Sequence, residues 1–452
     1  MKKLIALLLT LVMVLSFAAC AKTEAPAENT TEATTEATTE ATTASTTEVT
    51  VMTHEEFMAA ELDSDVVVET YVQATQSWWD NKITVYCQSP DGAYFLYEMA
   101  CSEEDAAKLV PGTKIRVTGY KGEWAGEIEI MDGTFEFVEG DAYIAEATDV
   151  TELLGTEELI AHQNEFVAFT GMSVVAIEFK NGEPGDDIYV TLAKNGATYS
   201  FCVERYLTGP ETEVYTTVGT LELGDIVDVE GFLYWYEGMN PHITSVTVTG
   251  AAMSHADYIA AELETEVNLI TYVQANQSWW DNKITLYCQN EDGACFLYEA
   301  ACSEETAALL VPGTQILVNG YKGEWAGEVE VMDATFVIVP GDDTFVAEAL
   351  DVTELLGTDE LIAHQNELVA FKGMTVEAIE FKNGEPGDDI YVTVSYEGVS
   401  YSFCVERYLT GPETEVYAAV SALAAGDVVD IEGFLYWYEG VNTHITAVVP
   451  AV

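Results

Sequence analysis

The chain has 452 residues and a formal net charge of −62, from 78 acidic against 16 basic residues. Such a field repels phosphate backbones, whose binding normally needs Lys and Arg to displace counterions, so nucleic-acid binding is disfavoured. Hydrophobic residues make up 49% of the chain. This content and length predict several globular domains rather than one domain with a long disordered tail.

The first 20 residues have the pattern of a bacterial export signal. Lys2 and Lys3 precede an apolar stretch over residues 4–19, which matches the charged start and hydrophobic core of such a signal. The stretch ends in Phe-Ala-Ala-Cys and resembles a bacterial lipobox, although Phe17 stands where Leu is usual. The resemblance implies that Cys20 is acylated after cleavage and anchors the protein to the outer face of the cell membrane. A plain secretory signal with a coincidental cysteine is the alternative.

Residues 21–50 are almost entirely Thr, Glu and Ala. They cannot bury enough apolar surface to offset the entropy of ordering, so we expect a disordered tether that lifts the following domains off a membrane. Fully stretched, the tether would reach on the order of 100 Å, at about 3.3 Å per residue. No later stretch is apolar over about 20 residues, so the sequence predicts no membrane-spanning helix beyond the signal.

Residues 53–249 and 254–449 are two copies of nearly the same sequence. QSWWDNKIT occurs at 76–84 and 277–285, and SFCVERYLTGPETEVY at 200–215 and 402–417. A modular unit used twice is more typical of binding and scaffold proteins than of enzymes. Each copy divides into two domains of different kinds. They are called A and B in the first copy and A′ and B′ in the second. Their expected boundaries are 51–142, 143–250, 251–343 and 344–452.

Domain A is expected to begin with a short helix, because Thr53 and Glu56 form a capping-box pattern. A further short helix is expected after Ser102. Alternating apolar residues and turn signals predict strands at 66–75, 82–88, 93–99, 113–120 and 127–138. The order of three strands, a helix and two strands resembles the OB-fold, a small five-stranded barrel. Another small barrel or sandwich would fit the same order.

Domain B repeats this scheme after a joining segment, residues 149–163, that is expected to be helical. A helix is expected at about 210–221. Strands are predicted at 165–179, 187–193, 198–207, 226–236 and 242–248, with Asn195-Gly196 as a hairpin turn. The predicted fold class is therefore all-β with short helices, built as four tandem OB-like five-stranded barrels in two A–B repeats.

The arrangement also resembles multi-OB surface lipoproteins of Gram-positive bacteria. The similarity lies in the signal, the Thr/Glu tether and the string WWDNK…DGAY…PGTKI…GYKGEW. The resemblance implies a lipid-anchored surface protein and does not name a ligand.

Two loops of domain A carry the residues that favour ligand binding. OB-folds often bind ligands beside the loop after strand one and the loop between strands four and five. Flat aromatic faces beside carboxylates and amides suit sugar rings, so glycans of the cell wall or of a host are the expected ligands. Packing of the tryptophans within or between barrels is the alternative. The candidate ligand-binding residues are Trp78, Trp79, Asp80, Lys82, Lys121, Glu123 and Trp124, with Trp279, Trp280, Asp281, Lys283, Lys322, Glu324 and Trp325 in the second copy.

An acidic loop in domain B is a weaker candidate for Ca²⁺. Its carboxylates could supply oxygen ligands, although such turns are usually just solvated and no cofactor is otherwise expected. The residues are Glu183, Asp186 and Asp187, with Glu385, Asp388 and Asp389 in the second copy. Three cysteines in one copy and four in the other argue against a shared disulfide framework and favour buried free thiols.

No catalytic motif is present, since the chain lacks HExxH, GxSxG and phosphate-binding loop patterns. The recurring histidines, such as His162 and His242, are expected on helix surfaces or strand ends. The sequence thus favours a non-enzymatic surface binding protein. A protein-interaction scaffold without a small ligand is the alternative, and OB-type nucleic-acid binding is a weaker one, because aromatic residues are present but a basic groove is not.

Overall fold

A computed structural model describes residues 50–451 of the chain. The expected signal peptide, the acylation site Cys20 and residues 21–49 of the expected tether lie outside the described residues. Among those that are described, no helix is both long and apolar enough to cross a membrane.

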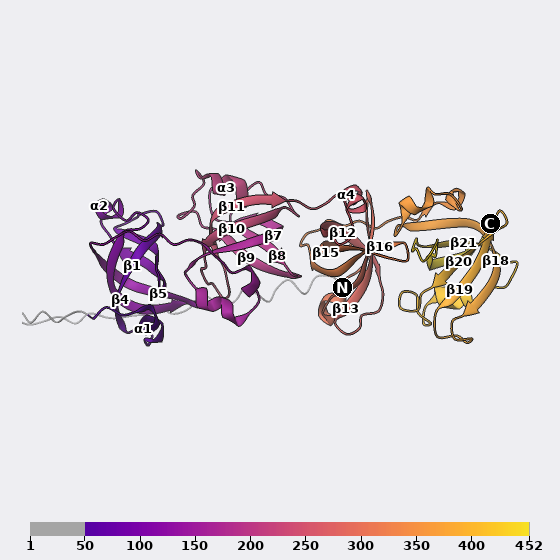
Figure 1. Ribbon diagram of the computed structural model, residues 1–452, viewed down its shortest axis with the longest axis horizontal. Helices are drawn as coiled ribbons and strands as arrows, with labels where there is room; N and C mark the ends of the chain where they lie inside the picture. The colour runs from indigo at the N-terminus through magenta and orange to yellow at the C-terminus, as the bar shows by residue number, and fades with distance from the viewer. Residues whose placement is uncertain (1–49, 452) are drawn as a thin grey trace, which may run out of the picture. The chain divides into compact units, whose positions relative to one another are not determined.

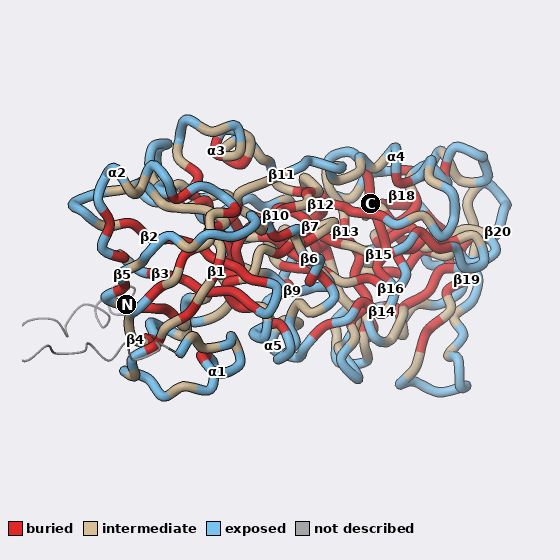
Figure 2. The backbone as a smooth tube through the Cα atoms, turned by 60° about the vertical axis from the view of Figure 1, so that its left-hand side comes forward, coloured by how far each residue is buried: buried red, intermediate tan, exposed pale blue. Residues whose placement is uncertain are grey.

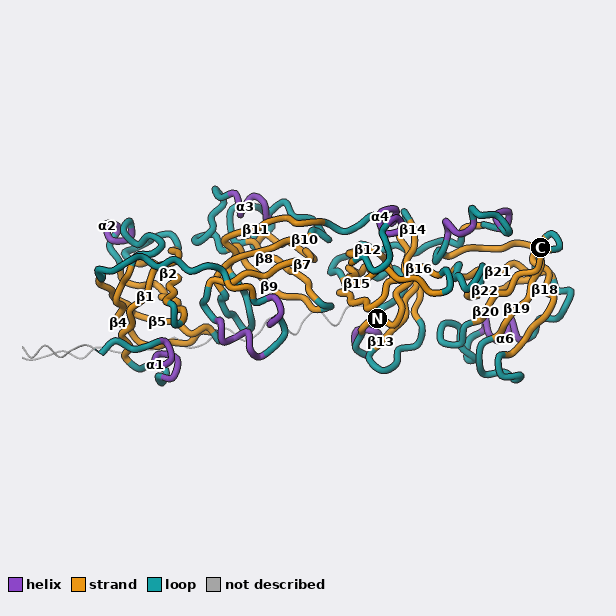
Figure 3. The backbone as a smooth tube through the Cα atoms, viewed as in Figure 1, coloured by secondary structure: helices purple, strands orange, loops and turns teal. Residues whose placement is uncertain are grey.

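Barrel A is a closed five-stranded barrel (Figures 1 and 3). Its strands neighbour one another in the order β1-β2-β3-β5-β4, and β4 pairs back onto β1. This is the strand order of the OB-fold. Its elements are α1 His54–Ala59, β1 Asp65–Thr75, β2 Lys82–Ser89, β3 Gly92–Ala100, α2 Glu103–Ala106, β4 Lys114–Trp124 and β5 Glu127–Phe137. The predicted capping box is present, because Thr53 and Glu56 each accept a backbone N–H from the other residue.

Barrel B has the same order, β7-β8-β9-β11-β10, closed by pairing of β10 with β7. The short strand β6 adds to the edge of β7 in parallel. The elements are β6 Thr148–Asp149, η1 Thr151–Leu153, η2 Glu157–His162, β7 Phe166–Phe179, β8 Ile188–Lys194, β9 Ala197–Val203, α3 Glu213–Val218, β10 Ile226–Phe232 and β11 His242–Gly250.

The second copy repeats both barrels, which confirms the predicted fold class of OB-like barrels in two A–B units. Barrel A′ contains α4 His255–Ala260, β12 Glu266–Asn276, β13 Lys283–Asn290, β14 Gly293–Ala301, α5 Glu304–Ala307, β15 Gln315–Trp325 and β16 Glu328–Ile338. Barrel B′ contains β17 Leu350–Asp351, η3 Thr353–Leu355, η4 Leu361–His364, β18 Leu368–Phe381, β19 Ile390–Tyr396, β20 Val399–Val405, α6 Glu415–Ser421, β21 Val428–Phe434 and β22 His444–Pro450.

The structure differs from three local predictions. The segment 149–163, predicted as helical, forms two short 3-10 helices, with Gly155 at a φ of 76° between them. The strand predicted at 226–236 ends at Phe232. The strand predicted at 198–207 ends at Val203. There the Glu204 carboxylate accepts the backbone N–H groups of Tyr206 and Leu207 and folds the chain into a turn.

Each barrel has its own hydrophobic core, visible as the buried strands in Figure 2. The two copies differ inside these cores. Val85 of barrel A corresponds to Leu286 of barrel A′, Tyr94 to Cys295, and Met99 to Ala300. The seven cysteines of the described residues are free and buried.

Barrels A and B meet through an aromatic contact. The buried Tyr86 ring stacks on Phe232 with ring centroids 4.5 Å apart, and both pack with Phe95. The Tyr86 hydroxyl lies 2.5 Å from Nδ1 of His242. The Gln88 side chain accepts the backbone N–H of Phe166 at 2.8 Å. The equivalent residues of barrels A′ and B′ make the same stacking and the same hydroxyl–imidazole contact.

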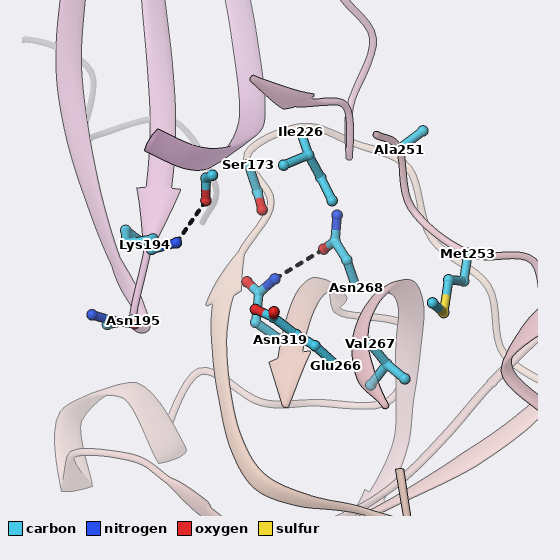
Figure 4. Close-up of a pocket in the computed structure, with 11 residues that line it drawn as sticks. Ser173, Lys194, Asn195, Ile226, Ala251, Met253, Glu266, Val267, Asn268 and Asn319 are labelled. Carbon is cyan, nitrogen blue, oxygen red and sulfur yellow. Dashed lines mark hydrogen bonds between the residues drawn. The ribbon is translucent and has the colours of Figure 1, made fainter. Parts of the chain in front are cut away.

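A different contact joins barrel B to barrel A′. Val175 and Ala193 of barrel B pack with Leu317 and Val337 of barrel A′ in a small apolar cluster, with Ile270 at its border. Beside it, the Asn319 amide donates to Asn268 at 3.2 Å, a bond drawn in Figure 4. Asn268 in turn donates to the carbonyl of Gly224 in barrel B at 3.0 Å. A Cβ on Gly224 would lie 2.7 Å from Ala252 Cβ, so the backbones approach closely here.

The residues of this joint are those in which the copies differ most in chemistry. Ile270, Leu317 and Val337 correspond to Glu69, Arg116 and Glu136 of barrel A. In barrel A these three form ion pairs at 2.6 Å on an outer face. On the other side of the joint, Val175 corresponds to Glu377 of barrel B′. The apolar residues therefore occur only in the copies that contact each other.

Rebuilding the charged face of barrel A in barrel A′, with Ile270→Glu, Leu317→Arg and Val337→Glu together, should leave barrel A′ folded and loosen the joint. The expected loss of joint stability is several kcal/mol, at about 1.5–3 kcal/mol for each fully buried aliphatic side chain. Spin labels on exposed strands of barrels B and A′ should report a broadened distance distribution.

The matched control is Leu309→Lys. Leu309 is exposed in barrel A′ and corresponds to Lys108 of barrel A, so this substitution should leave the distance distribution unchanged. A triple variant with the wild-type distribution would show that the apolar cluster does not hold the joint.

Candidate ligand cleft between barrels A and B

An aromatic cleft of about 760 Å³ lies where barrels A and B meet. Barrel A contributes side chains from β3, β5 and the end of β4, and barrel B from β8, β9 and the segment between β10 and β11. The lining residues are Gln76, Phe95, Tyr97, Trp124, Glu129, Met131, Asp187, Tyr189, Ser200, Cys202, Glu204, Tyr234, Tyr236, Asn240 and His242. Six of the lining side chains are Phe, Tyr or Trp, and none is Lys or Arg.

Trp124 is the most exposed aromatic residue of the cleft, with 63% of its surface accessible. It sits at the end of β4, and a tight turn with positive φ at Ala125 and Gly126 reverses the chain beside it. This turn is hydrogen-bonded to barrel B, since the backbone N–H of Glu237 donates to the Ala125 carbonyl at 2.7 Å. A Cβ on Gly126 would lie 2.8 Å from the Trp235 ring, so glycine is required at this contact.

Glu127 fixes the same turn from inside the interface. Its side chain is fully buried, and one oxygen accepts the Trp235 N–H at 2.8 Å. Burial raises the pKa of Glu127 to about 8, so this carboxyl is protonated at neutral pH. The same oxygen also accepts from the Gln163 side chain at 3.3 Å. The other Glu127 oxygen lacks a hydrogen-bond partner among the described residues.

Glu129 differs from the other acids of the cleft. Only 4% of its surface is exposed, and burial raises its pKa to about 7. Asp187 pairs with Lys180 at 2.7 Å and accepts the Arg205 N–H. Glu204 accepts two backbone N–H groups. No residue among 50–451 donates a hydrogen bond or an ion pair to the Glu129 carboxylate, and its oxygens are not among the fully buried unpartnered atoms, so they face the space of the cleft.

His242 closes the inner end of the cleft as a neutral group. Burial lowers its pKa to about 4. Its ring stacks on Tyr234 with centroids 4.4 Å apart, and Nδ1 contacts the Tyr86 hydroxyl. The histidine was expected at a strand end, where it does lie, but it is buried in the interface.

The second copy keeps every one of these lining residues. They are Gln277, Phe296, Tyr298, Trp325, Glu330, Met332, Asp389, Tyr391, Ser402, Cys404, Glu406, Tyr436, Tyr438, Asn442 and His444. Glu330 is 5% exposed, and burial raises its pKa to about 7. The core residues between the same strands have changed, as Val85/Leu286 and Met99/Ala300 show. The lining is therefore unchanged between copies whose barrel cores have diverged.

The structure separates the tryptophans of the two loops that the sequence predicts to form one binding site. Trp78 and Trp279 pack against the barrel cores, and each indole N–H donates to a backbone carbonyl, that of Cys101 or Cys302. Trp79 and Trp280 are more than half exposed but do not line the cleft described above. Only Trp124, and by its identical sequence Trp325, belongs to the cleft.

The lysines among the candidates have structural partners. Lys121 is 5% exposed, and its ammonium donates to the carbonyls of Met58 and Ala60 at the end of α1. Lys322 does the same at the end of α4. The assignment of these two lysines to ligand binding is thus replaced by a role in tying the helix to the barrel. Lys82 and Lys283 pair with Glu98 and Glu299.

The remaining loop candidates lie at the tips of turns. Asp80 and Asp281 have positive φ in the tight turns that follow Trp79 and Trp280. Glu123 and Glu324 are exposed next to Trp124 and Trp325.

The acidic loop proposed for Ca²⁺ forms internal pairs. Asp186 accepts from Asn181 and lies 3.8 Å from both Lys180 and Arg205. Glu183 is exposed. The second copy repeats these pairs at Asp388 and Asp389, and Glu385 is likewise exposed. Within residues 50–451 no group of three or more His, Cys, Asp or Glu side chains is placed to hold a metal ion.

Most residues of the cleft are not predicted from the sequence, including Tyr97, Tyr189, Tyr236 and Glu129. These residues come from strands and turns of two barrels, and no local pattern links them. One signal was available in the sequence, the tyrosine-rich string LYWYEG that occurs unchanged at 233–238 and 435–440.

No protein-family model and no curated protein matches the chain. Among solved structures, a murine DNA-binding protein bound to double-stranded DNA aligns with 12% identity and a TM-score of 0.24, over 42% of this chain and 97% of that one. The tetrameric p202 HIN2 aligns with 13% identity and a TM-score of 0.20, over 39% and 92%. A replication protein A heterotrimer bound to single-stranded DNA aligns with 10% identity and a TM-score of 0.21, over 86% and 94%. The OB-like assignment rests on the strand order within each barrel.

The raised pKa of Glu127 and Glu328 predicts a pH dependence of stability. Each group binds its proton more tightly in the folded chain than in the unfolded chain, where its pKa is near 4.5. The contribution to stability is therefore full below about pH 4.5 and is lost as the pH rises towards about 8. Glu127→Gln with Glu328→Gln keeps a neutral side chain of nearly the same shape at each position. This variant should be a few kcal/mol more stable than the wild type at pH 8.

Thermal unfolding between pH 5 and 8 tests this prediction. The control is Glu61→Gln with Glu262→Gln, two exposed acids that remove the same charge in each copy. If the buried-site variant and this control lose stability equally as the pH rises, Glu127 and Glu328 are not the titrating groups.

Proposed function

We propose that this protein is a non-enzymatic binding protein that holds glycans in two equivalent clefts, one in each A–B unit. The observation that carries the proposal is a cleft lined both by exposed aromatic rings and by Glu129, an acid without a partner in the described chain. Tyr97, Trp124 and Tyr236 are each more than 40% exposed although they line a cavity. Exposed rings in a concave site are surfaces that a ligand can cover.

The chemistry of the cleft fits a sugar chain. The C–H faces of a pyranose ring are apolar and stack on aromatic rings, while its hydroxyl groups donate hydrogen bonds to carboxylates. The cleft offers both, with Trp124 and the tyrosines for stacking and Glu129 as the unpaired acceptor. Its volume of about 760 Å³ is within the roughly 300–1,000 Å³ that is usual for small-molecule sites.

Nucleic acid fits the cleft less well, although bases also stack on aromatic rings. Single-strand binding combines stacking with a positively charged groove that follows the phosphates. The lining has no Lys or Arg and contains the acids Glu129, Asp187 and Glu204. A net charge of −62 would also repel a polyanion at a distance.

The proposal places the two clefts at a bacterial cell surface. Its support is the sequence pattern alone, with an apolar signal that ends in the lipobox-like Cys20 and is followed by the Thr/Glu segment. Two identical clefts on one chain would raise the overall affinity for a repetitive ligand, because the second binding event becomes intramolecular. Cell-wall and host glycans are repetitive ligands of this kind.

Replacing Trp124 and Trp325 together by alanine should weaken glycan binding about tenfold or more, since an aromatic stacking partner is worth roughly 0.5–1.5 kcal/mol beyond its buried area. The purified chain is first screened against an array of oligosaccharides, and the best ligand is then titrated by calorimetry.

The comparison variant is Trp79→Ala with Trp280→Ala, because these tryptophans are similarly exposed but lie outside the cleft. It should bind like the wild type. A chain that binds no oligosaccharide, or that loses binding equally in both variants, would contradict the cleft as a glycan site and favour a scaffold without a small ligand.

The surface location has its own test. Cys20→Ala should abolish incorporation of radiolabelled palmitate and shift the protein from the membrane fraction to the medium of a Gram-positive expression host. A Cys20→Ala protein that stays in the membrane fraction would mean that the N-terminal segment anchors the chain without acylation.

A further inference from the structure

We infer that the ligand of each cleft carries a positively charged alkylammonium group, which sits among the aromatic rings and pairs with Glu129 in one unit and Glu330 in the other. This inference rests on the proposed function, since it assigns a chemical class to the ligand of the same cleft.

The first argument is that Glu129 has no hydrogen-bond or ion-pair partner among the described residues. An ionised carboxylate away from water is costly unless a cation or several donors compensate it. Glu129 is 4% exposed and Glu330 is 5% exposed. The other two acids of the lining have donors, Lys180 for Asp187 and backbone N–H groups for Glu204. Glu129 is therefore the position where an incoming cation gains most.

The second argument is that the protein supplies no cation of its own there. None of the lining residues is Lys or Arg, and His242 is neutral because burial depresses its pKa to about 4. Two lysines of the surrounding segments are already engaged, Lys121 by two carbonyls at the end of α1 and Lys180 by Asp187. A cation that pairs with Glu129 in its ionised form can therefore be supplied by a ligand.

The third argument is the ring of aromatic side chains. The negative faces of Trp and Tyr rings attract alkylammonium groups, and several such rings around one point form the usual recognition site for quaternary ammonium. Trp124, Tyr97, Tyr189, Tyr234 and Tyr236 line the same cavity as Glu129. An apolar cation gains from both the rings and the carboxylate, whereas a neutral sugar gains only stacking and one hydrogen bond.

The excess of acidic residues over the whole chain also favours a cationic ligand. With 78 acidic and 16 basic residues, the protein raises the local concentration of cations around it. This long-range field has no specificity, so the selection of an ammonium ligand falls to the rings and Glu129.

The test compares choline with 3,3-dimethylbutanol, which has the same shape but no charge, by calorimetric titration of the purified chain. Choline is expected to bind at least tenfold more tightly than its neutral counterpart. Glu129→Gln with Glu330→Gln should remove that preference, and Trp124→Ala with Trp325→Ala should weaken choline binding. The exposed pair Glu61→Gln with Glu262→Gln is the charge-matched control and should bind like the wild type.

The pH profile adds a readout that loss of structure would not produce. Choline keeps its charge at every pH, so a change in its affinity reports on the protein. Because burial raises the pKa of Glu129 to about 7, affinity should rise several-fold between pH 6 and pH 8 as the carboxylate ionises. The Glu129→Gln, Glu330→Gln variant should show no such rise.

The outcomes separate this inference from the proposed function. Equal affinity for choline and its neutral counterpart, or a preference that survives in Glu129→Gln with Glu330→Gln, would overturn the ammonium inference. If neutral oligosaccharides bind while choline does not, the glycan function stands without an ammonium group. If glucosamine oligomers bind more tightly than their N-acetylated forms, the charge belongs to a glycan. If choline binds and no glycan does, the ligand is a free ammonium compound.

Discussion

The packing of barrel A on barrel B is the constraint from which the rest of each unit follows. Tyr86 lies between Phe95 and Phe232, and its hydroxyl contacts His242, so a fully buried aromatic column joins the two barrels. The column sets the separation of the two sheets at the inner end of the cleft. Because these side chains are buried, they gain apolar contact that an isolated OB barrel would leave exposed to water. The cleft is the space that remains beside this contact.

The interface also explains the unusual carboxyl groups. Glu127 is placed where a charge would be costly, and it is tolerated because it is protonated and hydrogen-bonded to the backbone of Trp235. Glu129, two residues further along the same strand, is buried at the cleft and has no such partner. Alternate residues of a strand point to the same side of the sheet. Strand β5 therefore supplies both Glu127, which holds the barrels together, and Glu129, which faces the cleft.

After the duplication, one part of the surface stayed the same in both copies and another part changed. The cleft lining and the aromatic column are the same in both copies, while the joint between barrels B and A′ uses apolar residues where barrel A has an ion-paired cluster. Recent duplication alone would not distribute the differences in this way, because the core positions between the cleft strands have also changed. The pattern is consistent with one surface kept for binding and another altered so that neighbouring units contact each other.

The elements, their order and the repeat follow from local patterns in the amino-acid sequence. Strand alternation, capping residues and turn signals act over a few residues, so they predicted the five strands of each barrel within a few positions and the OB order with them. They could not predict which side chains of barrel A would face barrel B, because that depends on contacts between residues such as Tyr86 and His242, more than 150 positions apart. The lysines show the same limit. Lys121 looks like a loop cation in the sequence, yet folding places its ammonium at the end of α1. The aromatic cleft and its unpaired carboxylate exist only in the tertiary structure, because two barrels must pack before their side chains enclose a common space.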